Sequence, residues 1–238
     1  MKDEVIRLEK VSKFYHMGSV VVKALDGVSI VVNRGEFVAI MGPSGSGKST
    51  CMNLVGSLDV PTKGRIFLDG QDISKMSESK LAQIRGKKIG FIFQSFNLIP
   101  NLTALENVML PMMFQGASVK KRKEVAARLL RLVGLGDRMG HFPNQLSGGQ
   151  MQRVAIARSL ANDPEVILAD EPTGNLDTKT GDIVIHFIEK LNKEGKTIVL
   201  VTHDQNLAIK HADIVYWLRD GRIEKVTRTR RRSRGRLR

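Results

Sequence analysis

The chain has 238 residues, of which 42% are hydrophobic and 26% are charged, so it is long enough to bury a core as one large domain, or as one domain with an inserted part. No apolar run approaches the ~18 residues that a membrane-spanning helix needs, and charged residues recur within the first ten positions, which argues against a secretory signal. The single cysteine, Cys51, cannot form an internal disulfide, so we expect a reducing cytosol as the compartment.

The formal net charge is +14, but its location weakens a nucleic-acid interpretation. The last eleven residues, Arg228 to Arg238, contain seven arginines and no acidic residue, so half of the excess charge lies in this tail. The simplest interpretation of such a run is a disordered, solvated end. The alternatives are contact with anionic lipid headgroups and nonspecific binding of RNA or DNA.

Strand patterns dominate the first hundred residues. The apolar runs are rich in Val and Ile, and the run at 37–41 is nearly all apolar, as expected for a strand buried on both faces. The predicted strands are 6–11, 20–32, 37–41, 65–68 and 88–93, and the predicted helices are 48–56 and 77–85.

A glycine-rich loop separates the strand at 37–41 from the helix that follows. It matches the pattern G-x-x-x-x-G-K-[ST] of a phosphate-binding loop. The loop consists of Gly42, Pro43, Ser44, Gly45, Ser46, Gly47, Lys48, Ser49 and Thr50. Glycines let the backbone approach a ligand closely, and backbone N–H groups at a helix N-terminus attract anions. We therefore expect Lys48 to reach the terminal phosphates of a nucleotide and the Ser49 hydroxyl to be a ligand of Mg²⁺.

Helical patterns replace strand patterns from about residue 95 to 160. Capping-box patterns at Thr103–Glu106 and Ser147–Gln150 each open a predicted helix, and 119–133 has apolar positions at helical spacing. We interpret this stretch as a helical subdomain inserted into an α/β core. Its Met-rich segment 96–114 either packs internally or forms an adaptable apolar groove for a partner's helix.

Strands alternate with helices again after Pro164. The predicted strands are 166–169, 197–201, 213–218 and 222–226, the last two as a hairpin, and a helix is predicted at 178–192. This alternation indicates a mainly parallel sheet, in which ligands lie at the carboxyl ends of the strands. Four side chains should therefore join the phosphate-binding loop at one edge of the sheet: Gln94, Asp170, Glu171 and His203.

These strand-end side chains suit nucleotide hydrolysis, which needs a metal, an oriented water and cations that offset developing charge. Asp170 follows four apolar residues and suits Mg²⁺ coordination, and Glu171 is our candidate for polarising the attacking water. Gln94 can contact water, the metal or a phosphate oxygen, and His203 can donate to the γ-phosphate. Taken alone, each of these last two is explained as readily by a structural role.

A second helix start has features that the fold alone does not explain. Gly148 and Gly149 follow Ser147 at the beginning of a predicted helix, where each glycine weakens helix propensity by roughly 1 kcal/mol relative to alanine. They expose a helix N-terminus that an anion can approach. Because one nucleotide already has such an end at Lys48, we expect the second to serve the nucleotide of another subunit. This predicts a dimer with ATP at its interface.

Taken together, the motifs resemble those of the ATP-binding subunit of ABC transporters. They are the phosphate-binding loop, Gln94, the LSGGQ sequence at 146–150, the run 166–171 and His203, and the resemblance covers about 8–226. It implies an α/β fold: a P-loop NTPase core with a mainly parallel sheet, an N-terminal antiparallel β subdomain, and the inserted helical subdomain at about 95–160. The ATP-binding domain would occupy 1–226, and 227–238 would be the basic tail.

The resemblance also implies roles by position. Tyr15 corresponds to the aromatic residue that stacks on adenine, and Asp177 ends a loop, 175–177, that communicates across the dimer. The signature contacts to the partner's γ-phosphate would come from Ser147, Gly149 and Gln150. The catalytic set would be Glu171, His203, Gln94 and Lys48, and Mg²⁺ would be held by Ser49, Gln94 and Asp170.

Finer features resemble the lipoprotein-releasing and macrolide-exporting group. They lie in the segments 93–100, 102–108 and 170–177. The implied partners are a second copy of the chain and an integral membrane permease, with no specific nucleic acid, and the implied location is cytoplasmic, on the inner face of the cell membrane. The alternatives are a cell-division-type ABC ATPase and a soluble ABC-type ATPase that acts on nucleic acid or ribosomes, which only the arginine tail favours.

Overall fold

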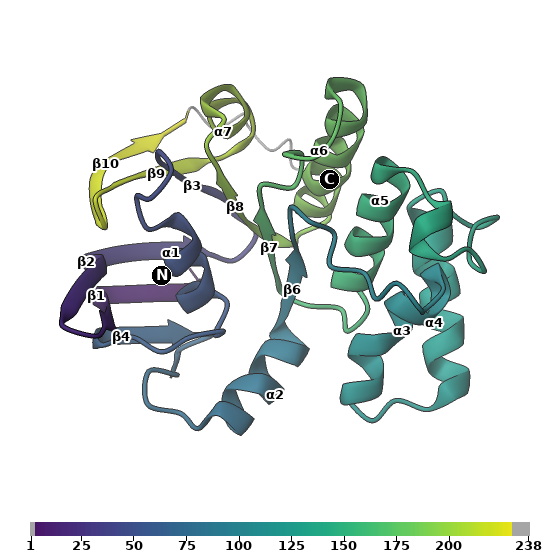
Figure 1. The fold of residues 1–238 in the computed structure, drawn as a ribbon, viewed down its shortest axis with the longest axis horizontal. Coiled ribbons are helices and arrows are strands. Elements are labelled where there is room, and N and C mark those ends of the chain that lie inside the picture. Colours follow the sequence, from purple (N-terminus) through teal and green to yellow (C-terminus); the bar gives the residue numbers. More distant parts are fainter. Residues whose placement is uncertain (1–2, 230–238) are drawn as a thin grey trace.

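The computed structural model in Figure 1 describes residues 3–229. Within them the strands form two sheets, one with the order β2-β1-β4-β5 and one with the order β10-β9-β3-β8-β7-β6. The strands are β1 (Glu4–Met17), β2 (Val20–Asn33), β3 (Phe37–Met41), β4 (Lys63–Leu68), β5 (Gln71–Asp72), β6 (Ile89–Ile92), β7 (Val166–Asp170), β8 (Thr197–Thr202), β9 (Ile214–Arg219) and β10 (Arg222–Arg228). The helices are α1 (Lys48–Val55), α2 (Glu78–Lys88), α3 (Ala104–Phe114), α4 (Val119–Leu132), the 3-10 helix η1 (Pro143–Gln145), α5 (Gly148–Ser159), α6 (Thr178–Lys193) and α7 (Gln205–His211).

The two sheets differ in strand direction. The N-terminal sheet is antiparallel throughout, since β1 pairs with β2 and β4, and β4 pairs with β5, in opposite directions. In the larger sheet β9, β3, β8, β7 and β6 are parallel, and only the β9–β10 hairpin is antiparallel. The predicted α/β class, with a mainly parallel sheet and an antiparallel N-terminal subdomain, is therefore confirmed.

Strand β3 shows how the larger sheet divides the core. All of its side chains are buried, as its apolar sequence predicts. Val38 and Ile40 pack in a cluster with the N-terminal sheet and α1. Phe37 and Ala39 point to the other face, where they pack with α3 to α7. Because successive side chains of a strand point to opposite faces, α1 and α5 lie on opposite sides of the larger sheet.

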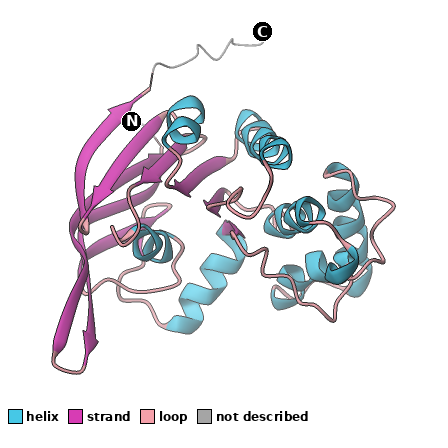
Figure 2. Ribbon diagram, turned by 45° about the horizontal axis from the view of Figure 1, so that its top comes forward, coloured by secondary structure: helices cyan, strands magenta, loops and turns pink. Residues whose placement is uncertain are grey.

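Helices α3, α4 and α5 lie together on one side of the molecule in Figure 2, with α5 next to β6 of the larger sheet. Both predicted capping boxes are present: Thr103 and Glu106 cap α3, and Ser147 and Gln150 cap α5. Each box satisfies backbone N–H groups that a helix start otherwise leaves unpaired. The local sequence therefore sets where these two helices begin.

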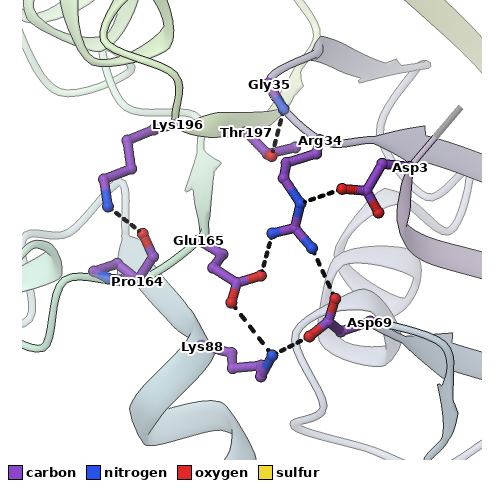
Figure 3. Close-up of polar contacts among 9 residues, drawn as sticks. All are labelled: Asp3, Arg34, Gly35, Asp69, Lys88, Pro164, Glu165, Lys196 and Thr197. Carbon is purple, nitrogen blue, oxygen red and sulfur yellow. Dashed lines mark hydrogen bonds and ion pairs between the residues drawn. The ribbon is translucent and has the colours of Figure 1, made fainter.

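A polar network ties the N-terminal sheet to the core at the amino ends of the parallel strands (Figure 3). Arg34, between β2 and β3, pairs with Asp3 at 2.7 Å, with Asp69 at 2.8 Å and with Glu165. Lys88 pairs with the same Asp69 and lies 3.3 Å from Glu165. This network is at the edge opposite the strand ends that carry the candidate site, so it supports the fold and takes no part in the site.

The structure differs from the sequence prediction in several segments. The β1–β2 hairpin is longer than predicted. Register shifts near Lys10, whose φ is 47°, interrupt the alternation of side chains, so the sequence pattern did not show the full length of the strands. Helix α7 was not predicted, since seven residues are too few for a clear helical period. Strand β10 runs to Arg228, so the predicted tail begins inside a strand, and residues 230–238 of that tail lie outside the described residues.

None of the helices in the described part of the chain is both long and apolar enough to cross a membrane.

Candidate functional site

Strand order brings the predicted site residues to one edge of the larger sheet. Met41 at the end of β3 pairs with Thr202 at the end of β8, and Asp170 at the end of β7 pairs with Val201. Ile92 at the end of β6 pairs with Ala169. The segments that follow these four strands are therefore neighbours, although they are scattered in sequence.

The phosphate-binding loop presents backbone donors and one cation. Gly47 caps α1 with a φ of 99°, and no side chain of the described residues caps this helix start. The ammonium group of Lys48 donates to the carbonyl oxygens of Gly42 and Pro43, both at 2.8 Å. The Ser46 hydroxyl is buried without a hydrogen-bond partner among residues 3–229. Uncapped N–H groups, and a cation that donates to backbone carbonyl oxygens and forms no ion pair among residues 3–229, fit a polyphosphate.

The first glycine of the loop has a packing requirement of its own. A Cβ atom at Gly42 would lie 2.1 Å from the carbonyl oxygen of Leu218 and 2.6 Å from the Ser46 hydroxyl. We expect Gly42→Ala to lower the thermal midpoint by roughly 2–10 °C, because the backbone of β9 must move. Nucleotide binding should weaken with it, since the loop shifts. Thermal unfolding and calorimetric titration with ATP measure the two effects.

The control for this prediction is Gly140→Ala, where the added atom meets no described heavy atom within 4 Å. It should leave both the midpoint and the ATP affinity unchanged. Equal effects of the two substitutions would contradict the role of close packing at Gly42.

Asp170 is suited to hold a cation. It is half-buried at the end of β7, and burial is the largest cause that raises the pKa of its carboxyl group, followed by the neighbouring Glu171 charge, while Lys48 acts in the opposite direction. Within residues 3–229, no three His, Cys, Asp or Glu side chains are grouped as metal ligands. A metal here would have one carboxylate, with hydroxyl, amide and phosphate oxygens as further ligands, and this donor set fits Mg²⁺.

Glu171 and His203 form a pair beside Asp170. Glu171 Oε1 accepts from the backbone N–H of His203 at 2.9 Å and lies 2.7 Å from His203 Nδ1. Glu171 Oε2 accepts from the Thr202 hydroxyl at 3.3 Å. The backbone of Glu171 has a φ of 43°, a left-handed conformation that is strained for a non-glycine residue and is typical of functional sites. The sequence did not single out Thr202, which orients this carboxylate.

Gln94 lies against the loop that follows Glu171. Its carbonyl oxygen accepts from Asn175 Nδ2 at 3.0 Å. A Cβ atom at Gly174 would lie 2.7 Å from Gln94 Nε2, so the Gln94 side chain packs closely on that glycine. The structure thus brings Gln94 next to the loop 175–177, whose last residue, Asp177, caps α6 by accepting from Thr180 N–H at 3.0 Å.

Tyr15 lies on β1 with a partly exposed ring. Its hydroxyl donates to Asp59 at 3.0 Å, and the ammonium group of Lys13 lies 5.2 Å from the ring centroid. Burial raises the pKa of the Tyr15 hydroxyl, so the phenol stays neutral. With 37% of its surface exposed, Tyr15 offers area for stacking. The sequence did not identify Lys13 or Asp59, because no local pattern marks these contacts.

Packing requires one of the two glycines at the start of α5. A Cβ atom at Gly149 would lie 2.2 Å from Thr180 Cγ2, so this glycine lets α5 pack closely on α6. The prediction that the fold does not explain the two glycines is therefore wrong for Gly149. At Gly148 an added Cβ would make ordinary contacts of 3.5 Å and longer, so packing does not require that glycine.

The exposed Ser147 caps α5, which packs on the other face of the larger sheet from α1, the helix that follows the phosphate-binding loop. Its hydroxyl accepts from Gln150 N–H at 3.3 Å, and Gln150 Oε1 accepts from Ser147 N–H at 2.8 Å. Figure 1 shows α5 and α1 on different sides of the larger sheet. Within residues 3–229, the hydrogen bonds of Ser147 and Gln150 are with each other and not with the loop around Lys48, and the two segments belong to helices on opposite faces of the sheet.

Comparisons with known proteins agree with this geometry. The family model described as ABC transporter matches residues 25–174. An uncharacterized ABC transporter ATP-binding protein of Thermotoga maritima is 57% identical over 94% of this chain and 96% of its own length. The macrolide export ATP-binding/permease protein MacB of Hyphomonas neptunium is 50% identical over 94% of this chain and 34% of its own length.

Solved structures of ATP-binding cassettes also match this chain. The ATP-binding cassette MJ0796, solved as a dimer in a post-hydrolysis state bound to ADP and Pi, is 48% identical and has a TM-score of 0.88, covering 95% of this chain and 99% of that chain. An uncharacterized ABC transporter ATP-binding protein MJ0796 of Methanocaldococcus jannaschii is 51% identical over 95% of this chain and 98% of its own length. These names favour the transporter hypothesis over one in which the chain acts on nucleic acid.

Proposed function

This chain belongs to the ABC transporter family of ATP-binding proteins, and we propose that it hydrolyses ATP at sites shared by two copies arranged head to tail. The observation that carries this proposal is the position of α5, which begins with Ser147 and Gln150 and packs on the face of the larger sheet opposite α1. The dimeric state of the MJ0796 cassette supports it. In such a dimer, the start of α5 in each copy would contact the nucleotide bound to the other copy.

Each residue of the candidate site would have its own role in ATP hydrolysis. The phosphate-binding loop and Lys48 would bind the phosphates, and Tyr15 would stack on the adenine. Ser49, Gln94 and Asp170 would hold Mg²⁺, which neutralises phosphate charge when bound. Glu171 would accept a proton from the attacking water, and it is already oriented by its contacts with Thr202 and His203.

His203 would respond to the terminal phosphate. Its Nδ1 lies beside Glu171, so Nε2, on the opposite side of the imidazole ring, is directed away from that carboxylate. The partner copy would complete each site with Ser147, Gly149, Gln150 and Asp177. Closing and opening of the dimer can act on a further protein only if that protein binds the two states with different affinities.

That further protein would be an integral membrane permease. A groove of about 630 Å³ lies between α2, β6, α3 and α5 and is lined by apolar side chains such as Phe91, Pro111 and Phe114. We assign an apolar helix of the permease to it, because Phe114 is 78% exposed there. The likeness to MacB supports a transporter of the lipoprotein-releasing and macrolide-exporting type, with this chain on the inner face of the membrane.

Lys48→Ala tests the nucleotide site. We expect ATP affinity to fall about tenfold or more and hydrolysis to be lost, because charge-assisted contacts to phosphate contribute roughly 1.5–3 kcal/mol. Calorimetric titration and phosphate release measure these changes. Lys190→Ala is the matched control, since Lys190 is exposed on α6 and lies 4.0 Å from Glu194. Unchanged binding and turnover in Lys48→Ala would refute the assignment of this loop.

A further inference from the structure

Two side chains of α5 hold the segment that follows β6. Near the start of the helix, Gln152 Nε2 donates to the carbonyl oxygen of Pro172 at 2.7 Å and lies 3.5 Å from that of Phe93. One and a half turns later, Arg158 donates from Nη2 to the carbonyl oxygen of Phe96 at 2.8 Å and from Nη1 to that of Asn97. Gln94 lies inside the segment held by these contacts.

The part of the segment that Arg158 holds is strained. Phe96 has a φ of 59° and Asn97 a φ of 49°, so two consecutive non-glycine residues are left-handed. Such conformations are unfavourable for residues that carry a side chain and persist where surrounding contacts fix them. The two hydrogen bonds from Arg158 are such contacts.

The environment of Arg158 is unusual for a cation. Burial lowers the pKa of its guanidinium group, and no carboxylate in the described part of the chain forms an ion pair with it. Arg158 is half-buried, and a charge that is partly removed from water without a counter-ion is unfavourable unless its donors are satisfied. Here the acceptors are the two carbonyl oxygens of the strained loop, so the guanidinium group stabilises the loop conformation instead of an ion pair.

We propose that Arg158 is a positioning residue for Gln94, which fixes the loop at 95–97 so that the Gln94 side chain stays at the metal site. This inference rests on the proposed function, in which Gln94 is a ligand of Mg²⁺. From the other side, the Gln94 backbone is held by Asn175 and its side chain by Gly174. Removing Arg158 leaves the loop free to leave the left-handed conformation, and Gln94 moves with it.

The experiment measures the Mg²⁺ concentration that gives half-maximal ATP hydrolysis by the full chain. We expect Arg158→Met to raise this concentration about tenfold, the usual effect of removing a residue that orients a metal ligand. ATP affinity in the presence of EDTA should stay within about twofold of wild type, because the loop around Lys48 is untouched. Arg158→Lys should be intermediate, since an ammonium group cannot donate to both carbonyl oxygens in the same fork.

A double-substitution cycle separates this role from a general effect on the fold. If Arg158 acts through Gln94, then Arg158→Met should add nothing to the Mg²⁺ requirement of Gln94→Ala. Arg128→Met, at an exposed arginine on α4, is the control and should behave as wild type. Arg158 also lines the groove that Phe91, Pro111 and Phe114 form. Because the assay contains no permease, contacts between Arg158 and an occupant of this groove do not contribute.

Three results with the Arg158 variants would overturn the proposal. The first is an unchanged Mg²⁺ requirement in folded Arg158→Met, and the second is an unchanged requirement in Arg158→Lys if the methionine variant does not fold. The third is effects of Arg158→Met and Gln94→Ala that multiply in the double variant. Failure of the proposed function gives a different result, since wild-type chain would then not hydrolyse ATP. A Gln94→Ala variant with a normal Mg²⁺ requirement would remove Gln94 from the metal site, and the role of Arg158 with it.

Discussion

Replacing Glu171 by Gln is expected to leave MgATP binding intact and to slow hydrolysis by roughly 10²–10⁴-fold, the usual contribution of a general base. The amide keeps the shape of the carboxylate, and its single oxygen can still accept from the His203 N–H, while its NH₂ group takes the other position and donates to the Thr202 hydroxyl oxygen, but it cannot take a proton from water. ATP should therefore hold the dimer closed. Single-turnover phosphate release and size-exclusion chromatography in MgATP measure the rate and the dimer.

Glu189→Gln is a control with matched chemistry. Glu189 is a second glutamate paired with a histidine, at 2.7 Å from His211 Nδ1, but it lies on α6 away from the phosphate-binding loop. Its substitution should leave turnover close to wild type. Wild-type turnover in Glu171→Gln would remove Glu171 from its proposed role, and slow turnover in both variants would indicate a general effect of losing a His–carboxylate pair.

Replacing Ser147 by Arg should prevent ATP-dependent dimerisation, and hydrolysis should fall by at least about 100-fold, as when a group that acts only in the transition state is removed. Ser147 is exposed at the start of α5, where an arginine side chain occupies the approach of the partner's nucleotide and places a positive charge on a helix N-terminus. ATP binding to the monomer should be spared. Light scattering of the Glu171→Gln variant, with and without Ser147→Arg, measures the dimer directly.

Ser118→Arg controls for the lost helix cap. Ser118 caps α4 in the same subdomain by accepting from Lys121 N–H at 3.4 Å, so its loss destabilises a helix start by about 1 kcal/mol, as at Ser147. Dimerisation should persist in this variant. A Ser147→Arg chain that still forms dimers with ATP would contradict the shared site.

The local features of this protein could be predicted from short stretches of its sequence. The run 37–41, the loop around Lys48 and the capping boxes at Thr103 and Ser147 all appear where they were predicted. Each depends on residues within a few positions of one another: apolar side chains buried on both faces of a strand, glycines with positive φ, or a side chain that reaches a backbone N–H three residues away. Such interactions are encoded by short patterns, so short patterns identify them.

Contacts between residues that are distant in the sequence follow from the way the strands and helices assemble. The order β3-β8-β7-β6 is not the chain order, and it places Glu171 against His203. The requirement for Gly149 comes from Thr180 on another helix, and the partners of Arg158 are carbonyl oxygens about sixty residues away. Every residue has a backbone carbonyl oxygen, so the residue types do not show which one Arg158 contacts. A close approach between two helices depends on how both are packed. No local pattern can record such contacts, because they exist only once the sheet and its helices have assembled.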